Sequence, residues 1–253
     1  MLVVTDLDGT LLDHHTYSHA PATAALAELA RRTIPVVLNT SKTRTELVQL
    51  LPALQLNTPF IVENGSAIYD AEGETCQVLG VERPVLLEAL DEARCQGFEF
   101  NSYRDMGLDG VMAHTGLDRA AAKASLDREF TEPLVWQGTP ERRREFVSWI
   151  KAQGLQCLEG GRFLHVMGRC DKGAAMQQLR ESYYPDTEGP VVALGDSEND
   201  LAMLKRADIA VCIRSTSGKR LHLESDSNNT VMHTLACGPE GWAEAISEIL
   251  RAN

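Results

Sequence analysis

The sequence predicts an α/β protein whose core is a doubly wound, mostly parallel (Rossmann-like) sheet and which carries an inserted α+β domain. Short apolar runs alternate with amphipathic helical segments near both ends of the chain, a pattern typical of a parallel sheet with crossover helices. Between these two parts, helices interleave with hairpin-like strands, which indicates a separate α+β unit. With 253 residues, 43% of them hydrophobic, the chain is long enough to form both cores.

The first half of the predicted core alternates strands and helices. Pro21 suits the first turn of a helix, and Thr43 with Glu46 fits a capping box at the start of another. A Glu-Asn-Gly turn separates two later apolar runs. The predicted segments are a strand at 2–4, a helix at 21–32, a strand within 33–43, a helix up to Leu51 and two short strands within 59–70.

The pattern changes after about residue 80 and resumes later. The insert is predicted to contain helices at 83–96, 117–130 and 139–154, a strand at 132–136 and a hairpin within 155–168. The core then continues with a helix at 171–184, a strand at 189–196, a helix at 197–207 and a last core strand at 208–213. We therefore assign residues 1–80 and 166–253 to the core and 81–165 to the insert.

The composition disfavours two classes of partner. A formal net charge of −12 argues against a nucleic acid or an anionic membrane, which would need a basic face, although local basic spots such as Arg142 to Arg144 still permit a small anionic substrate. Secretory and transmembrane segments are missing from the sequence pattern, and the cysteines lack metal-like spacing, so a reduced, cytoplasmic protein is expected. We expect a monomer or a small homo-oligomer. The cysteines are Cys76, Cys95, Cys157, Cys170, Cys212 and Cys237.

Polar residues follow the predicted strands, where the carboxyl ends of a parallel sheet form its ligand-binding edge. Asp6 and Asp8 come directly after the first strand. Thr40 ends the second strand, Asp196 ends a later one, and Lys172 lies at a helix start. Buried carboxylates are costly unless they are paired or bind a metal, and hard oxygen donors suit Mg²⁺. These segments therefore predict a site for Mg²⁺ and a phosphate group.

This arrangement resembles the haloacid dehalogenase superfamily of phosphotransferases. The residues that carry the resemblance are "DLDGT" at 6–10, Thr40, Lys172 and "GDSEND" at 195–200. Four motifs in this order, at suitable places in a βαβ pattern, make the resemblance specific. It implies that the insert at 81–165 is the family's cap domain, which covers the site and selects the leaving group.

The resemblance also implies a role for each motif residue. Asp6 would be the nucleophile that forms an aspartyl-phosphate, and Asp8 would act first as general acid and then as base. Asp6, the main-chain carbonyl of Asp8, and Asp196 would hold Mg²⁺. Thr40 and Lys172 would stabilise the transferring phosphoryl group.

Three neighbouring residues complete this expectation. Asp200 would hold the metal-bound waters or Lys172 in position, and Asn199 is a further supporting residue. Ser41 is an alternative to Thr40 as the phosphate ligand.

Further segments resemble mannosyl-3-phosphoglycerate phosphatases over nearly the whole chain. They are "NTSKT" (39–43), "PFIVENGSAIY" (59–69), "TGLDRAAAKASLDREFTEPLVW" (115–136), "GGRFLHVMGRCDKG" (160–173) and "GPEGW" (238–242). The resemblance implies hydrolysis of mannosyl-3-phosphoglycerate to mannosylglycerate, a compatible solute, and phosphate.

The chemistry of such a substrate suggests further binding residues. A glycerate carboxylate favours an arginine fork, for which Arg162 is the first candidate and Arg128 and Arg169 follow. Glu63 and Asn64 are candidates for contacts with sugar hydroxyls.

Other readings remain open. A phosphatase for glucosyl-3-phosphoglycerate or another sugar phosphate would share every catalytic residue, and a phosphosugar mutase would use the same aspartate. A phospho-receiver module would need neither Asp8 as an acid nor the insert at 81–165.

Overall fold

A computed structural model of the chain describes residues 1–74, 76–160, 163–216, 218, 221–224 and 229–252. The strands are β1 (Leu2–Thr5), β2 (Val36–Leu38), β3 (Phe60–Val62), β4 (Ala67–Tyr69), β5 (Cys76–Val78), β6 (Phe100–Ser102), β7 (Thr131–Trp136), β8 (Gln156–Gly160), β9 (Phe163–Met167), β10 (Val191–Gly195), β11 (Ile209–Arg214) and β12 (Thr230–Cys237). The helices are η1 (Ala20–Ala22), α1 (Thr23–Arg31), α2 (Arg44–Leu50), α3 (Arg83–Cys95), α4 (Tyr103–Thr115), α5 (Arg119–Leu126), α6 (Pro140–Ala152), α7 (Lys172–Tyr183), η2 (Glu198–Asp200), α8 (Leu201–Leu204) and α9 (Gly238–Ala252).

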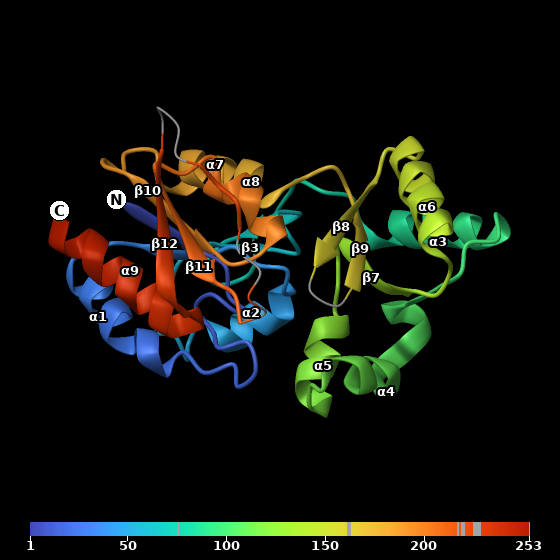
Figure 1. Cartoon of the computed structure of the whole chain (residues 1–253), viewed down its shortest axis with the longest axis horizontal. Coiled ribbons are helices and arrows are strands. Elements are labelled where there is room, and N and C mark those ends of the chain that lie inside the picture. The colour runs from blue at the N-terminus through green and yellow to red at the C-terminus, as the bar shows by residue number, and fades with distance from the viewer. Residues whose placement is uncertain (75, 161–162, 217, 219–220, 225–228, 253) are drawn as a thin grey trace.

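The core is a five-stranded sheet in the order β12-β11-β10-β1-β2, and every neighbouring pair is parallel. Side chains alternate along each strand. In β1, Val3 therefore packs on the face covered by α1 and α9, whereas Leu2 and Val4 pack on the face covered by α7 and α8 (Figure 1). Helices on both faces of a parallel sheet confirm the predicted doubly wound fold.

A small antiparallel sheet, β3-β4-β5, lies next to the edge of the core sheet. A bridge between Asn39 and Ile61 connects it to the end of β2. The turn between β3 and β4 contains Glu63 and Asn64, both with positive φ (48° and 62°). The two strands and the Glu-Asn-Gly turn predicted within 59–70 are confirmed.

The insert contains a four-stranded antiparallel sheet in the order β6-β7-β9-β8. Helices α3 and α6 cover one face, where they pack on Leu164 and Val166 of β9. His165 alternates to the opposite face, which is turned toward the core (Figure 1). The predicted hairpin is confirmed as the pair β8/β9. Two residues of its turn, 161 and 162, lie outside the described residues.

The structure contains elements that the sequence did not predict, among them β5, β6, α4 and β12. The strand at 208–213 is not the last of the core, because β12 follows and forms an edge of the sheet. Helix α4 was not predicted, since it bends at Gly107 (φ 57°) and its apolar residues do not keep one helical face. The boundary at 165 also falls inside β9, so we propose that the insert ends after Met167.

Each of the helices among the described residues is too short or too polar to span a membrane.

Candidate active site

The centre of the site is an ion pair between residues far apart in the sequence. Asp6 follows the last residue of β1, and Lys172 is the first residue of α7. The Nζ atom of Lys172 donates to Oδ1 of Asp6 over 2.6 Å, and both side chains are buried. The side-chain amide of Asn39, at the end of β2, donates to the carbonyl of Lys172 over 2.8 Å and fixes the start of the helix.

Two further carboxylates come from the loop after β10. Asp196 follows Gly195, the last residue of that strand, and Asp200 lies one turn later. Lys172 donates to Oδ1 of Asp200 over 2.6 Å, while Oδ2 of Asp200 accepts from the amides of Asp196 and Ser197, each over 3.1 Å. A Cβ atom on Gly195 would lie 2.5 Å from Cβ of Asp200. Glycine is therefore required for this close turn.

The three carboxylates, from Asp6, Asp196 and Asp200, are grouped closely enough to hold a metal ion. Each offers an oxygen, and these oxygens lie within 4.8 Å of one another. Lys172 is the amine bound within the group, and one positive charge does not neutralise three carboxylates. Asp200 already accepts from the lysine and two amides, which leaves Asp6 and Asp196 to bind the cation. Their hard oxygen donors fit Mg²⁺.

Burial makes two of these carboxylates difficult to ionise without a cation. It raises the pKa of Asp6 to about 7 against the attraction of Lys172, and repulsion from Asp200 and Asp8 adds to the rise. It raises the pKa of Asp196 to about 8, and Asp6 and Asp200 contribute to that rise. A bound divalent cation would favour both anions.

The loop after β1 supports Asp196. Thr10 donates its hydroxyl to Oδ1 of Asp196 over 3.2 Å. A Cβ atom on Gly9 would lie 2.7 Å from Oδ2 of the same carboxylate, and Gly9 has a φ of 82°. The glycine of "DLDGT" is thus needed both for its backbone conformation and for the approach of Asp196.

Asp8 lies beside this group and has a different partner. Its Oδ2 atom forms an ion pair with Nζ of Lys42 at 2.8 Å. Its Oδ1 atom is buried and has no hydrogen-bond partner in the described part of the chain. Since its carboxylate is outside the group that could hold a metal, Asp8 is available to exchange a proton with a bound substrate.

Thr40 follows β2 by two residues and is 1% exposed. Its amide donates to the carbonyl of Ile61 over 3.2 Å, and its carbonyl accepts from the amide of Asn64 over 2.9 Å. Ser41, half-buried, has its carbonyl bound by Arg128 of the insert over 3.3 Å. The main chain of this loop is therefore held from two sides beside Asp6.

The structure argues against a substrate contact for Glu63. Its carboxylate is 1% exposed and accepts from the amides of Glu129 and Phe130 (2.8 and 3.2 Å) and the hydroxyl of Thr131 (2.5 Å). Both oxygens thus accept hydrogen bonds from residues 129–131, where β7 begins, and Glu63 connects the core to the insert. Arg162, the first candidate for the carboxylate, lies outside the described residues.

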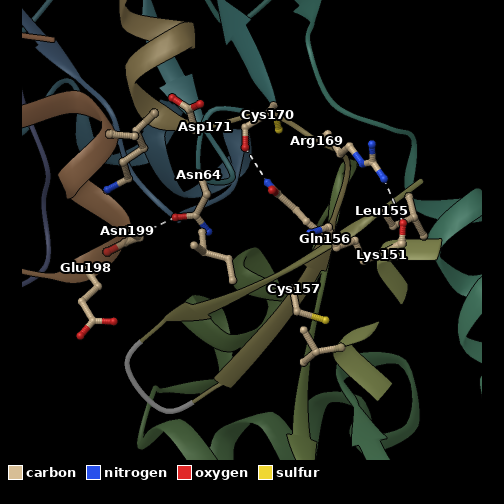
Figure 2. A pocket seen from close by; sticks show the side chains of 14 residues that line it. Asn64, Lys151, Leu155, Gln156, Cys157, Arg169, Cys170, Asp171, Glu198 and Asn199 are labelled. Atoms are coloured by element: carbon tan, nitrogen blue, oxygen red, sulfur yellow. Dashed lines mark hydrogen bonds between the residues drawn. The ribbon is translucent and has the colours of Figure 1, made fainter. Parts of the chain in front are cut away.

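A cavity of about 590 Å³ opens between core and insert next to Lys172, and Figure 2 shows its lining. On the core side, Asn64 accepts from the amide of Asn199 over 3.0 Å, while Nδ2 of Asn64 is buried and has no hydrogen-bond partner among the described residues. Gln156 reaches in from β8, and Arg169 lies near the far end (Figure 2). Amide and guanidinium groups of this kind suit the hydroxyls of a sugar, and the volume suits a small molecule.

Lys42 was not predicted as a site residue, although it lies in the same "NTSKT" segment as Thr40. Its signal was present, because a lysine two residues after a strand-end threonine is well placed to reach the same crevice. Trp242 of "GPEGW" belongs to the core: it is fully buried and donates from Nε1 to the hydroxyl of Thr5 over 3.0 Å.

Comparison with known proteins supports this picture. Residues 3–133 and 159–223 match the family described as haloacid dehalogenase-like hydrolase. The chain is 35% identical over 268 aligned positions to the glucosyl-3-phosphoglycerate/mannosyl-3-phosphoglycerate phosphatase of Methanococcoides burtonii, an alignment that covers 100% of this chain and 98% of the relative.

Solved structures show the same fold at low identity. A protein of Thermoplasma acidophilum superposes with a TM-score of 0.72 at 18% identity, covering 98% of this chain and 97% of that one. A haloacid dehalogenase-like hydrolase from B. subtilis superposes with a TM-score of 0.69 at 19% identity, covering 98% and 99%.

The predicted enzyme class, a phosphoric monoester hydrolase, is confirmed by the matched family and by the phosphatase relative. By its sequence over most of its length, and by its fold over nearly all of it, this chain belongs to the haloacid dehalogenase-like hydrolases.

Proposed function

We propose that the enzyme is a Mg²⁺-dependent phosphatase that hydrolyses mannosyl-3-phosphoglycerate through an aspartyl-phosphate. The observation that carries this proposal is the contact of Lys172 with Asp6 and Asp200, at 2.6 Å each, beside Asp196. It combines a buried nucleophile, a fixed positive charge and carboxylates for a cation at one sheet edge. Phosphoryl transfer requires mainly such positioning and charge stabilisation.

In the first step, a carboxylate oxygen of Asp6 attacks phosphorus, and the bond from phosphorus to the leaving oxygen breaks. Lys172 holds Oδ1 of Asp6 and so fixes the rotation of the carboxylate. Asp8, in its acid form, gives its proton to the leaving oxygen, which departs as the alcohol of mannosylglycerate. A phosphoryl group is then bound to Asp6.

In the second step, a water molecule attacks the phosphorus of the aspartyl-phosphate. Asp8, now a carboxylate, takes a proton from the water, and the bond between phosphorus and Asp6 breaks. Phosphate is released, and both aspartates return to their starting forms. Thr40 and Lys172 stabilise the charge on the phosphoryl oxygens in both steps. Mg²⁺, held by Asp6, the Asp8 carbonyl and Asp196, would supply charge neutralisation and orient the phosphoryl group.

The choice of substrate is supported by a relative and by the cavity. The phosphatase of Methanococcoides burtonii, 35% identical along the full chain, is named for both the glucosyl and the mannosyl 3-phosphoglycerate esters. The cavity of about 590 Å³ beside Lys172 has a largely apolar lining with a few polar groups, among them Asn64 and Gln156, that could bind the hydroxyls of a hexose. Glucosyl-3-phosphoglycerate is the second candidate, since the two sugars differ in one hydroxyl configuration.

A phosphate-release assay tests the proposal. It compares mannosyl-3-phosphoglycerate, glucosyl-3-phosphoglycerate, 3-phosphoglycerate and mannose 6-phosphate, each with Mg²⁺ and with a chelator. We expect multiple turnovers with Mg²⁺ alone and the highest kcat/KM for the mannosyl ester. A higher kcat/KM for mannose 6-phosphate would contradict the substrate assignment, and full activity in chelator would contradict the metal requirement.

A further inference from the structure

Arg128 of the insert contacts the core loop after β2 that contains Thr40 and Ser41. It lies between α5 and β7, and its side chain is 6% exposed. Its Nη1 atom donates to the carbonyl of Ser41 over 3.3 Å and to the hydroxyl of Thr131 over 2.7 Å. Its Nε atom is buried and without a hydrogen-bond partner among the described residues. A buried guanidinium with an unused donor is costly unless a ligand completes it.

Lys42 lies on the core side of this contact, directly after Ser41, whose carbonyl accepts from Arg128. Its Nζ atom lies 2.8 Å from Oδ2 of Asp8 and 3.6 Å from Oε1 of Glu46, and its side chain is 14% exposed. A lysine ammonium has three donors; beyond these two carboxylates, Nζ has only the weak contact with the Tyr17 ring, 5.1 Å from its centroid. The pair with Asp8 also places the ammonium next to the group that would protonate the leaving oxygen.

Tyr103, at the start of α4, shows that the two cations share one environment. The Arg128 guanidinium lies 5.5 Å from the centre of the Tyr103 ring. Burial raises the pKa of the Tyr103 hydroxyl, and the charges of Arg128 and Lys42 both oppose that rise. Both cations, together with the carboxylates of Glu46 and Glu132, therefore lie within electrostatic range of the Tyr103 hydroxyl of the insert.

The carboxylates near these cations are largely satisfied by other donors. Glu63, 3.6 Å from Arg128, accepts from two main-chain amides and the hydroxyl of Thr131. Glu46 accepts from the amide of Thr43 over 2.9 Å in the capping box of α2. Arg128 and Lys42 therefore retain capacity for an anion that comes with a substrate.

A fourth polar group, His165, lies close to Arg128. The Nδ1 atom of His165, on the face of β9 turned toward the core, is buried and has no partner among the described residues. Burial and the charge of Arg128 lower the pKa of His165 to about 3, so the ring is neutral and close to Arg128. A neutral imidazole nitrogen can complete a hydrogen bond to a hydroxyl beside the anion.

We propose that Arg128 of the insert and Lys42 of the core form a subsite for a carboxylate on the leaving group. This inference rests on the proposed function, because a glycerate supplies such a group. Its carboxylate carbon is two bonds from the carbon that bears the leaving oxygen, and Lys42 contacts the acid that serves this oxygen. A guanidinium offers a carboxylate the paired donors it prefers.

Two matched substrates isolate the carboxylate. 3-Phosphoglycerate and glycerol 3-phosphate differ by a carboxylate in place of a hydroxymethyl group. We expect Arg128→Gln to lower kcat/KM for 3-phosphoglycerate and for mannosyl-3-phosphoglycerate about ten- to hundredfold, mainly by raising KM. For glycerol 3-phosphate and an aryl phosphate we expect less than about a threefold change. Lys42→Gln should show the same selective loss in addition to any effect shared by all substrates through Asp8.

Controls separate charge from structure. Arg119→Gln removes an exposed cation from α5, and it should leave every kinetic constant unchanged. Arg128→Lys should recover part of the affinity for the carboxylate substrates. Glycerate should inhibit the wild type and should need at least tenfold higher concentration to inhibit Arg128→Gln, whereas inhibition by inorganic phosphate should be equal in both.

Each outcome has a distinct meaning. Equal losses on all four substrates, with unchanged inhibition by glycerate, would overturn the subsite and leave Arg128 as a structural partner of Glu63. If the wild type itself shows no preference for 3-phosphoglycerate esters over mannose 6-phosphate, the proposed function fails instead. If the Arg128→Gln protein is unstable, the kinetics of Arg128→Lys and the inhibition of Lys42→Gln by glycerate decide the question instead.

Discussion

The Nζ atom of Lys172 lies 2.6 Å from Oδ1 of Asp6, and the lysine side chain is completely buried. Burial alone would remove the charge of this ammonium, but the carboxylates of Asp200 and Asp6 outweigh that effect and raise the pKa of Lys172. The lysine therefore remains positive at every pH at which the enzyme would act. Breaking one side of such a buried pair is costly, so the nucleophile and its counter-ion have a fixed geometry before a substrate binds.

Replacement of Asp6 tests the nucleophile. Asp6→Asn should lower kcat by about 10⁴-fold or more, since the amide cannot form the acyl-phosphate and members of one catalytic unit are individually essential. Phosphate release under saturating substrate and Mg²⁺ measures the effect. Circular dichroism and thermal unfolding serve as the control for folding. A variant with more than about a tenth of wild-type kcat would exclude Asp6 as the nucleophile.

Asp8→Asn tests the proton donor separately. We expect kcat for a sugar-phosphate substrate to fall by about 10²- to 10⁴-fold, the usual contribution of general acid–base catalysis. With an aryl phosphate, whose leaving group needs no proton, the first step should be less affected, and a burst of released phenol should precede slow turnover. Equal losses in the pre-steady-state burst for both substrate types would assign Asp8 a role other than proton transfer.

The choice between Thr40 and Ser41 is testable by a matched pair of substitutions. Thr40 is 1% exposed, and its hydroxyl accepts from the amide of Lys42 over 3.3 Å, so the hydroxyl has a defined position. Thr40→Ala should lower kcat/KM about 10²-fold, as loss of one preorganised donor does, and Thr40→Ser should restore most of it. Ser41→Ala should change kcat/KM less than about threefold. The reverse order would make Ser41 the phosphate ligand.

The buried carboxylates also predict how stability depends on pH without Mg²⁺. The pKa values of Asp6 and Asp196 are raised from 3.8 to about 7 and about 8. Between the ordinary pKa and the raised pKa of each group, the folded protein binds more protons than the unfolded chain. The stabilisation that is present below pH 4 is therefore lost as the pH rises toward 8. The slope is at most about 1.4 kcal/mol per pH unit for each group. Urea unfolding in a chelator at pH 5, 6, 7 and 8 measures it.

The stabilisation by Mg²⁺ should increase as the pH rises, because protons compete with the cation for the same oxygens. The increase in Tm caused by Mg²⁺ should be larger at pH 8 than at pH 6, relative to NaCl of equal ionic strength. Asp196→Asn should abolish this difference. An equal Tm increase at both pH values in the wild type would show that the cation does not bind at Asp6 and Asp196.

The fold was predictable because its signals are local and repeated. Apolar runs and helical periodicity identified β1, β10 and α7, and parallel topology then placed the residues after each strand at one edge. Helix α4 was not predictable, since Gly107 bends it and its packing depends on the insert. Edge strand β12 lacks the continuous apolar run of a buried strand, because its residues are only partly covered.

The site was predictable only for residues that belong to a motif. Lys172 and Asp196 lie in recognisable settings, and the structure places them beside Asp6. The position of Lys42 two residues after Thr40 indicates the crevice, but its ion pair with Asp8 arises from tertiary packing and is not visible in the sequence. The same holds for Glu63. An acid on a turn suggests a free side chain, but this turn packs against the start of β7, which buries the Glu63 carboxylate.

This placement makes Glu63 a test of stability. Glu63→Ala should lower the free energy of unfolding by about 3–5 kcal/mol, because it removes the acceptor of three hydrogen bonds and leaves Arg128 without its buried partner. Glu63→Gln, which keeps an acceptor oxygen, should lose less, and Glu92→Gln on the exposed face of α3 should lose almost nothing. Urea unfolding of the three variants gives these values. If Glu63 instead binds a sugar hydroxyl, Glu63→Ala will raise KM for the mannosyl ester while its unfolding matches that of Glu92→Gln.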